Sequence, residues 1–468
     1  MASAVRERII KSLRTCLLGR DPVTFGVCPI PEQNLGLFYG KGDAARQLYL
    51  HTASDAELEH LARACTAATF GINQQDVYDE TYRKAGKMDV EEFASKFDLE
   101  RSGILTRIKN DLLDEDRIKS DRHLECELYK LNFYATGGFF KAHKDTPRSA
   151  NMFGSLVIVF PTKHTGGELK LRHGGKKWTF DSAKELAAVT EPSIGYIAFF
   201  SDVEHEVAVV QSGYRVTLTY NLYFRESHAP SESLINLDVN RENTFKTGLE
   251  QLLADPAFLP KGGRIGFGLQ HEYPVSAETK LSTLMHCLKG SDALVKKVCE
   301  QLSLPIQPKM LTHADDYDTY DEEDGIIGLR EISDESEDAV EDNGQGESVK
   351  DNPYYLEVLT DHVVDLSDWP FSVENTGREL RNAEGALILP LRPSGRHRQR
   401  YDFGKDKKVR YSVNIRWITE PTLYNEVKTP YIAYGNEHSL NYLYGTVCFV
   451  AKIGPPGKRI KDQHSGGA

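Results

Sequence analysis

The stretch SLVIVFPTKHTGGELKLRHGGKKWTFD, residues 155–181, decides how the central part of this chain folds. It contains three short runs rich in β-branched, leucine and aromatic residues, and Pro or Gly clusters separate them. None of the runs is long enough for an ordinary helix, whereas short apolar runs bounded by Gly and Pro are typical of strands joined by turns. The stretch therefore predicts antiparallel β-structure.

Runs of the same kind continue on both sides, from Leu124 to Phe224. LECELYKLNFYATGGFF precedes the central stretch, and IGYIAFF, HEVAVV and RVTLTYNLYF follow it. Seven short runs at a spacing of roughly ten residues indicate a sandwich or barrel. We expect one helical insertion within this region, at residues 182–188.

Helical patterns appear mainly outside this β-rich region. Apolar residues recur at helical spacing in four segments, at residues 54–68, 102–113, 244–253 and 291–301. The first twenty residues mix charges with apolar positions, which predicts an amphipathic helix and not a signal peptide. Strand-like runs return in the last hundred residues. The predicted fold class is therefore mainly β with flanking helices (α+β).

Charge and cysteine usage limit the partners and the compartment. The formal net charge is −12, but residues 315–347 alone carry fifteen acidic residues and one Arg, so the rest of the chain is near +2. Without a basic field we expect no nucleic-acid partner. The seven cysteines are scattered and form no CxxC pair, which fits a reducing compartment, cytoplasmic or nuclear. No run of eighteen apolar residues occurs, so we expect no membrane partner.

A chain of 468 residues is too long for one ordinary core. We divide it into five regions by composition and pattern: a mixed N-terminal support region (1–120), a β-rich core (121–227), a mixed α/β region (228–313), an acidic mobile linker (314–352) and a C-terminal β-rich region (353–468).

His143 and Asp145 form the first candidate metal-binding pair. Residues two apart on a strand point to the same face, so an imidazole and a carboxylate would lie side by side. Such donors suit a divalent metal and leave room for a third ligand. The alternative is a surface ion pair, because one His-x-Asp is expected by chance in a chain with fifteen His.

His205 and Arg215 form the second candidate group. A turn at residues 211–213 predicts a hairpin that would bring the strand of Arg215 beside that of His205. Arg215 and Thr217 share one face of the returning strand. A guanidinium facing inward is costly unless it is paired, and a carboxylate ligand would pair it through two hydrogen bonds. The alternative is a salt bridge from Arg215 to Glu204 or Glu206.

Taken together, these motifs resemble the 2-oxoglutarate- and Fe(II)-dependent dioxygenase superfamily, on its prolyl 4-hydroxylase-like side. The resemblance covers about residues 124–224, roughly a fifth of the chain. It rests on His-x-Asp at 143–145, the distal His205, Arg215 ten residues beyond it, Tyr-x-x-Gly at 134–137 and Gly-Gly-Glu-Leu at 166–169. The resemblance implies a double-stranded β-helix (jelly-roll) core followed by the mixed C-terminal region.

The resemblance also implies the cofactors and the residues that hold them. Iron(II) would be bound by His143, Asp145 and His205. Arg215 would hold the distal carboxylate of 2-oxoglutarate, with hydroxyl groups from Thr217 and Tyr134 beside it. O2 is the second co-substrate, and ascorbate is an optional reductant.

The implied reaction is hydroxylation of a C–H bond with release of succinate and CO2. The substrate would be a protein prolyl or other side chain, and the alternatives are a small-molecule metabolite or a non-catalytic scaffold built on this fold. Arg148 and Met152 follow Asp145 and are candidates for the substrate entrance. His164 and His173 match no metal-site spacing, so we expect them at the surface.

Overall fold

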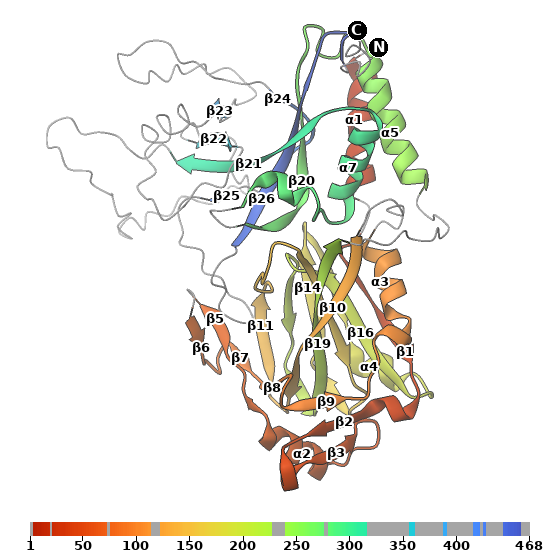
Figure 1. Ribbon diagram of the computed structural model, residues 1–468, viewed down its shortest axis with the longest axis vertical. Coiled ribbons are helices and arrows are strands. Elements are labelled where there is room, and N and C mark those ends of the chain that lie inside the picture. Colours follow the sequence, from red (N-terminus) through yellow and green to blue (C-terminus); the bar gives the residue numbers. More distant parts are fainter. Residues whose placement is uncertain are drawn as a thin grey trace, which may run out of the picture.

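The structure is a computed structural model. It describes residues 3–18, 21–72, 75–113, 122–226, 239–275, 279–315, 355–360, 387–390, 415–421, 425–426 and 443–459. A β-rich core occupies the lower part of Figure 1, and a second group of strands and helices lies above it.

Two antiparallel sheets form the β-rich core, which we call the jelly-roll core. The larger sheet has the order β1 (Val23–Pro29), β16 (Ser193–Phe200), β12 (Met152–Val159), β19 (Arg215–Glu226), β10 (Arg122–Tyr134), β8 (Gly86–Asp89) and β4 (Thr66–Ala67). The smaller sheet has the order β15 (Lys176–Phe180), β14 (Leu169–His173), β17 (Glu204–Val207), β11 (Phe139–His143) and β7 (Arg83–Lys84).

The chain alternates between the two sheets as it runs from β10 to β19. Strands β10, β12, β16 and β19 lie in the larger sheet, whereas β11, β14, β15 and β17 lie in the smaller one. This alternation is the connectivity of a double-stranded β-helix, so the predicted jelly-roll core is confirmed.

The predicted hairpin between the strands of His205 and Arg215 is wrong. β17 pairs with β11 and β14 in the smaller sheet, whereas β19 pairs with β10 and β12 in the larger one. The intervening β18 (Val210–Gly213) pairs instead with β13 (His164–Gly166). The two residues therefore belong to opposite sheets. The local sequence predicts the turn, but nothing in it indicates that the chain passes from the smaller sheet to the larger one.

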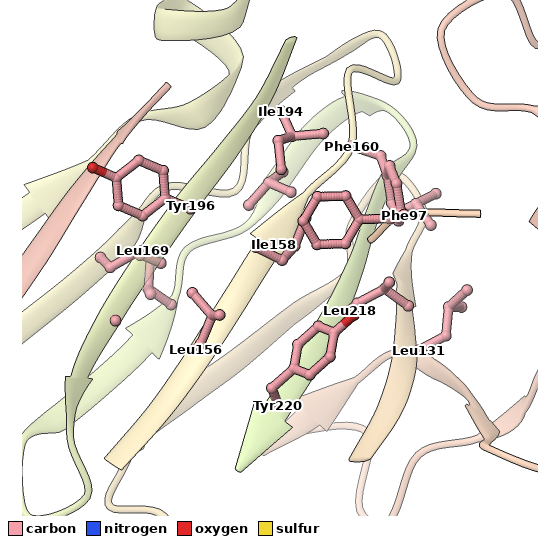
Figure 2. Packing of buried hydrophobic residues seen from close by; sticks show 14 of the residues in the cluster. Phe97, Leu131, Leu156, Ile158, Phe160, Leu169, Ile194, Tyr196, Leu218 and Tyr220 are labelled. Carbon is pink, nitrogen blue, oxygen red and sulfur yellow. The ribbon is translucent and has the colours of Figure 1, made fainter. Parts of the chain in front are cut away.

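Along β19 of the larger sheet, apolar and polar residues alternate between the two faces, as the period of two requires. Leu131, Leu218 and Tyr220 are buried in the apolar cluster shown in Figure 2. The alternate residues Thr217 and Thr219 line a cavity between the sheets. The apolar face anchors the sheet and leaves the polar face for the cavity.

The N-terminal region packs against the jelly-roll core. Helix α2 (Asp55–Ala64) begins at Ser54 with a capping box to Glu57, and α3 (Ile104–Leu112) buries Ile104 and Ile108 in the same apolar cluster. The predicted helical insertion is α4 (Ser182–Ala187). The remaining short elements are η1 (Glu32–Leu35), β2 (Gly36–Tyr39), η2 (Gly42–Ala44), β3 (Arg46–Tyr49), β5 (Phe70–Ile72), β6 (Gln75–Val77), β9 (Phe93–Ser95) and η3 (Glu100–Ser102).

A separate apolar cluster defines a second domain. Its sheet has the order β23 (Leu387–Pro390), β22 (Tyr355–Thr360), β21 (Ile306–Asp315), β26 (Leu443–Ile453), β20 (Gly263–Val275) and β24 (Ile415–Thr419), with β25 (Asn425–Glu426) beside β21. Its helices are α1 (Ser3–Leu18), α5 (Val239–Ala254), α6 (Leu281–Leu284) and α7 (Gly290–Gln301).

This second domain changes two boundaries of the predicted division. Helix α1 buries Ile10 and Leu13 in the second apolar cluster, not with the rest of residues 1–120. Strands from residues 228–313 and 353–468 pair in one sheet, so these two regions are one unit. Strand pairing between segments that are distant in the sequence produces no local sequence pattern, so it could not be predicted. Of the predicted acidic linker, all but its first two residues lie outside the described residues.

Within the part of the chain that the structure describes, no helix combines the length and apolar character that a bilayer crossing requires.

Candidate metal and dicarboxylate site

Three predicted metal ligands meet at one end of the smaller sheet. His143 ends β11 and is directly opposite His205 on the neighbouring β17, and Asp145 follows two residues later. The two imidazole rings are 4.3 Å apart at their centroids, and His205 Nε2 is 3.7 Å from Asp145 Oδ1. One ligand atom from each residue lies within 4.8 Å of the others, and all three residues are buried. Their proximity and burial argue against the surface ion pair.

Backbone carbonyl groups set the tautomer of both imidazoles. His143 Nδ1 is 2.7 Å from the carbonyl oxygen of Lys141, and His205 Nδ1 is 3.1 Å from that of Val203. Since a carbonyl only accepts, each Nδ1 carries the proton, and each Nε2 keeps a lone pair for a metal. Phe140 stacks on the His143 ring at 3.6 Å and restrains it.

Ser155 orients the carboxylate ligand. Its hydroxyl group on β12 donates a hydrogen bond to Asp145 Oδ2, and both residues are buried. Sequence reasoning missed this serine, because one Ser at the start of the apolar run at 155–160 resembles an ordinary strand residue. We expect Ser155→Ala to weaken metal binding by about 10- to 100-fold, the usual effect of losing a hydrogen bond to a ligand. Titration with Mn(II) would measure the change, and equal affinities would contradict the assigned role.

Arg215 is a buried cation that forms no ion pair among the described residues. It is 1% exposed, and within the described residues its Nε and Nη2 have no hydrogen-bond partner. Glu204 and Glu206, the alternative partners suggested by the sequence, form ion pairs with Arg172. Burial lowers the pKa of Arg215, although the charge of Glu168 acts to raise it. A guanidinium nevertheless stays protonated in proteins. Unpaired donors of this kind are costly unless a ligand pairs them.

The Gly-Gly turn lies directly against Arg215. A Cβ atom at Gly167 would come within 2.9 Å of Arg215 Cδ, and Gly167 has φ of +72°. We therefore expect Gly167→Ala to displace the guanidinium and strain the turn. The change should raise the 2-oxoglutarate concentration needed for half-saturation while leaving metal binding near the wild-type value. Parallel titrations with Mn(II) and with 2-oxoglutarate would separate the two effects.

The predicted site residues line one cavity between the two sheets. Its water-accessible volume is about 40 Å³. His143, Asp145, His205, Arg215, Thr217 and Tyr134 all line it. Tyr134 is opposite Arg215 on the paired strands, and the guanidinium carbon is 5.6 Å from the centre of its ring. Thr217 is likewise buried beside them.

The two candidates for the substrate entrance lie in different surroundings. Arg148 is exposed, its guanidinium carbon is 4.1 Å from the centre of the Tyr129 ring, and it donates a hydrogen bond to the Tyr129 hydroxyl group. Tyr129 lines the cavity, so Arg148 is close to its rim. Met152 is 2% exposed and does not line the cavity.

A buried polar chain crosses the cavity and was not predicted. Arg83, on the short β7, donates to the Asn132 side-chain oxygen at 2.9 Å, and Asn132 donates to the Thr219 hydroxyl at 3.1 Å. Arg83 also lies over the Phe140 ring at 4.3 Å. This chain ties the N-terminal region to both sheets. An isolated Arg in a short strand gives no sequence signal for such a role.

The structure also corrects the expected positions of two histidines. His164 is partly buried, and its Nε2 has no hydrogen-bond partner among the described residues; burial lowers its pKa. His173, with a side chain 15% exposed, groups with Asp202 and His271, and their ligand atoms lie within 4.8 Å of one another. A buried Lys289 ammonium group is already 2.8 Å from Asp202 Oδ1. A metal ion there would be repelled by this cation, so we assign the group to contacts between the domains.

Part of this chain is similar to known proteins. Residues 129–223 match the model of the 2OG-Fe(II) oxygenase superfamily. A search of curated proteins found no match. Among solved structures, a Pseudomonas putida prolyl-4-hydroxylase is similar at 15% identity, with 47% of this chain and 99% of that chain covered and a TM-score of 0.27.

Two further solved structures are similar at the same level. One is a Trichoplax adhaerens prolyl hydroxylase in complex with a peptide fragment of hypoxia inducible factor, at 15% identity over 47% of this chain and 91% of that chain, with a TM-score of 0.24. The other is SnoN, a non-heme α-ketoglutarate-dependent epimerase from nogalamycin biosynthesis, at 12% identity over 50% of this chain and 94% of that chain, with a TM-score of 0.24.

Proposed function

Since this chain carries a 2OG-Fe(II) oxygenase domain at residues 129–223, we propose that it is an oxygenase that hydroxylates a C–H bond of its substrate. The family implies Fe(II) and 2-oxoglutarate. The observation that carries the proposal is the buried Arg215, whose free donors share one cavity with two imidazoles and a carboxylate. These donor groups suit both a metal and a dicarboxylate.

The residues present fit this cofactor pair. Two neutral imidazole nitrogens and one carboxylate form the donor set of non-haem iron(II) oxygenases, with coordination positions left open. When bound, iron(II), 2-oxoglutarate and O2 together supply the oxidising chemistry, with succinate and CO2 as products. His143, Asp145 and His205 would hold the metal.

The protein would supply the positioning of the co-substrate. Arg215 would grip the distal carboxylate of 2-oxoglutarate through paired hydrogen bonds. Tyr134 and Thr217 line the same cavity as Arg215, and their hydroxyl groups would donate to that carboxylate. Leu169 and Val207, which also line the cavity, would keep water away from the reacting centre.

For the substrate, we propose a slender group such as a protein prolyl or other side chain. The metal ligands are only 4–6% exposed, so a bulky rigid surface could not reach them. Arg148, at the rim, would contact the part of the substrate that stays outside the cavity. Met152 would act only indirectly, by packing in the protein interior. A small-molecule metabolite is the second candidate, because it would reach the buried ligands equally well. Ascorbate would serve as the reductant that keeps the iron as Fe(II).

Measurement of succinate tests the proposal directly. The full chain would be incubated with Fe(II), 2-oxoglutarate, O2 and ascorbate, together with proline-containing peptides or metabolite extracts. We expect succinate to form and a substrate to gain one oxygen atom by mass. The peptide and metabolite arms distinguish the two substrate classes. Absence of succinate, with no effect of alanine at both His143 and Asp145, would instead support a scaffold.

A further inference from the structure

Two turns of the jelly-roll core contain or directly precede a proposed metal ligand, and both contact the second domain. The first, residues 143–146, follows β11 and contains Asp145. The second, residues 200–204, links β16 to β17 and leads into His205. We call these segments the ligand turns. In Figure 1 the second domain lies above one end of the jelly-roll core, and hydrogen bonds from its side chains reach both turns.

Tyr444, on β26 of the second domain, joins the two ligand turns. Its hydroxyl group is 2.7 Å from the carbonyl oxygen of Asp145 and 2.8 Å from that of Ser201. Both acceptors are backbone atoms, so the phenol O–H, shared between them, restrains the path of the chain on each side of the metal site. Burial raises the pKa of Tyr444 well above its ordinary value, and the phenol therefore remains a donor.

Asp202 ties the second ligand turn to the same domain. It lies three residues before His205, and its carboxylate accepts hydrogen bonds from Lys289 Nζ at 2.8 Å and His271 Nδ1 at 3.1 Å. The backbone N–H of Glu272 also donates to it, at 3.1 Å. All three donors belong to the second domain, so this turn is held by several bonds with different directions.

Lys289 and Glu272 extend these contacts to both turns. The Lys289 ammonium group also donates to the Ser201 hydroxyl at 3.2 Å and to the Glu272 carbonyl oxygen at 2.9 Å. The Glu272 side chain forms an ion pair with Lys144, the residue just before Asp145. The same small group of second-domain residues therefore reaches the neighbours of two metal ligands.

The burial of these charges indicates a geometric role. Lys289 and Asp202 are each 1% exposed. A buried ion pair adds little net stability, because removing two charges from water offsets their attraction, but its hydrogen bonds favour one arrangement of the groups. Apolar contacts could hold the two domains together without the cost of removing charged groups from water. Directional hydrogen bonds, by contrast, fix the turn that contains Asp145 and the turn that leads into His205.

We infer that the second domain is a positioning element of the metal centre, acting through Tyr444 and Lys289 on the ligand turns. Neither residue lines the cavity. Both set where the ligand-bearing backbone lies, and so the affinity and geometry of the bound metal. The inference rests on the proposed function, because it assumes that the site holds a metal.

Removal of one hydroxyl group tests the role of Tyr444. In the full chain, Tyr444→Phe keeps the ring and deletes both backbone contacts. With Mn(II) as a redox-silent probe, we expect about 10- to 100-fold weaker metal binding. The electron paramagnetic resonance spectrum of bound Mn(II) should broaden, since its ligands are less well fixed. Tyr49→Phe, which removes an exposed hydroxyl on β3 in the N-terminal region, is the matched control and should bind Mn(II) like the wild type.

The thermal unfolding temperature separates positioning from general stabilisation. If Tyr444→Phe lowers it but leaves Mn(II) affinity and spectrum unchanged, the hydroxyl group is only structural and the inference is wrong. If the wild type itself binds neither Mn(II) nor 2-oxoglutarate, the proposed function fails and the inference fails with it. Normal wild-type binding combined with unchanged Tyr444→Phe binding overturns the inference alone.

A second pair of variants covers the case in which one substitution unfolds the protein. Lys289→Met leaves the Asp202 carboxylate buried without its cation, which is strongly destabilising. Adding Asp202→Asn removes that unpaired charge and should restore folding. We expect the folded double variant to bind Mn(II) at least tenfold more weakly than the wild type. Wild-type affinity in the folded double variant would contradict the inference.

Discussion

Replacing His205 by alanine is expected to abolish turnover almost completely. The substitution removes one of the three proposed metal ligands from a buried site in which the other two, His143 and Asp145, are already close together. A bound metal stabilises the transition state by several kcal/mol, and a loss of about 4 kcal/mol lowers the rate about a thousandfold. We therefore expect succinate formation to fall by about a thousandfold or more, measured with saturating Fe(II) and 2-oxoglutarate.

A histidine outside the site provides the matched control. His60 lies on the exposed face of α2, and its Nδ1 is 3.0 Å from the Tyr39 hydroxyl oxygen. His60→Ala should keep wild-type activity and Mn(II) affinity. If His205→Ala retained more than about a tenth of the wild-type rate while binding metal normally, the assigned ligand set would be wrong.

The second large effect is expected at Arg215. Arg215→Met keeps most of the volume of the buried stem but removes the guanidinium. Loss of one partner from a buried, hydrogen-bonded charge pair costs about 2–5 kcal/mol, which corresponds to about a 30- to 4,000-fold higher half-saturating 2-oxoglutarate concentration. Metal affinity without 2-oxoglutarate should change little. Arg215→Lys keeps the charge but not the paired donors, so it should have a smaller effect.

The stability of Arg215→Met separates a ligand-binding role from a structural one. Because Nε and Nη2 of Arg215 have no partner in the described structure, removing this cation should not lower the free energy of unfolding in the absence of 2-oxoglutarate. Arg225→Ala is the control on the same strand, since Arg225 is exposed and pairs with Glu125. A marked loss of stability in Arg215→Met, with unchanged 2-oxoglutarate binding, would assign Arg215 to the fold.

The grouping of the candidate metal ligands was predictable because its signal is partly local. His143 and Asp145 are two residues apart on a strand end, and the alternation on β19 correctly places Arg215 and Thr217 on the cavity face. The helices at residues 54–68 and 102–113 were predictable for the same reason, because caps and apolar spacing act within a few turns. Local patterns therefore identify the elements and the residues that face the cavity.

Other parts of the structure depend on distant segments. The hairpin prediction for His205 and Arg215 failed because the choice of partner strand is made by β11 and β10, which lie far back in the sequence. Helix α1 has the amphipathic pattern expected, yet its apolar face meets α5 and the second sheet, over two hundred residues away. Hydrophobic periodicity shows that a face is buried, but not against which element.

The contacts at the ligand turns were not predictable for a related reason. Asp202, His271 and Lys289 are ordinary polar residues in the sequence, with no spacing that suggests a common site. They meet where two separate apolar cores pack together. Polar contacts between domains therefore have to be taken from the structure.

The central claim is that two imidazoles, one carboxylate and one guanidinium converge on a single metal ion and a single dicarboxylate. Anaerobic calorimetric titration of the full chain with 2-oxoglutarate, with and without Mn(II), tests it most directly. We expect one equivalent to bind tightly when Mn(II) is present, much weaker binding without the metal, and loss of binding in Arg215→Met. Binding of 2-oxoglutarate that ignores both Mn(II) and Arg215, or no binding at all, would contradict the account.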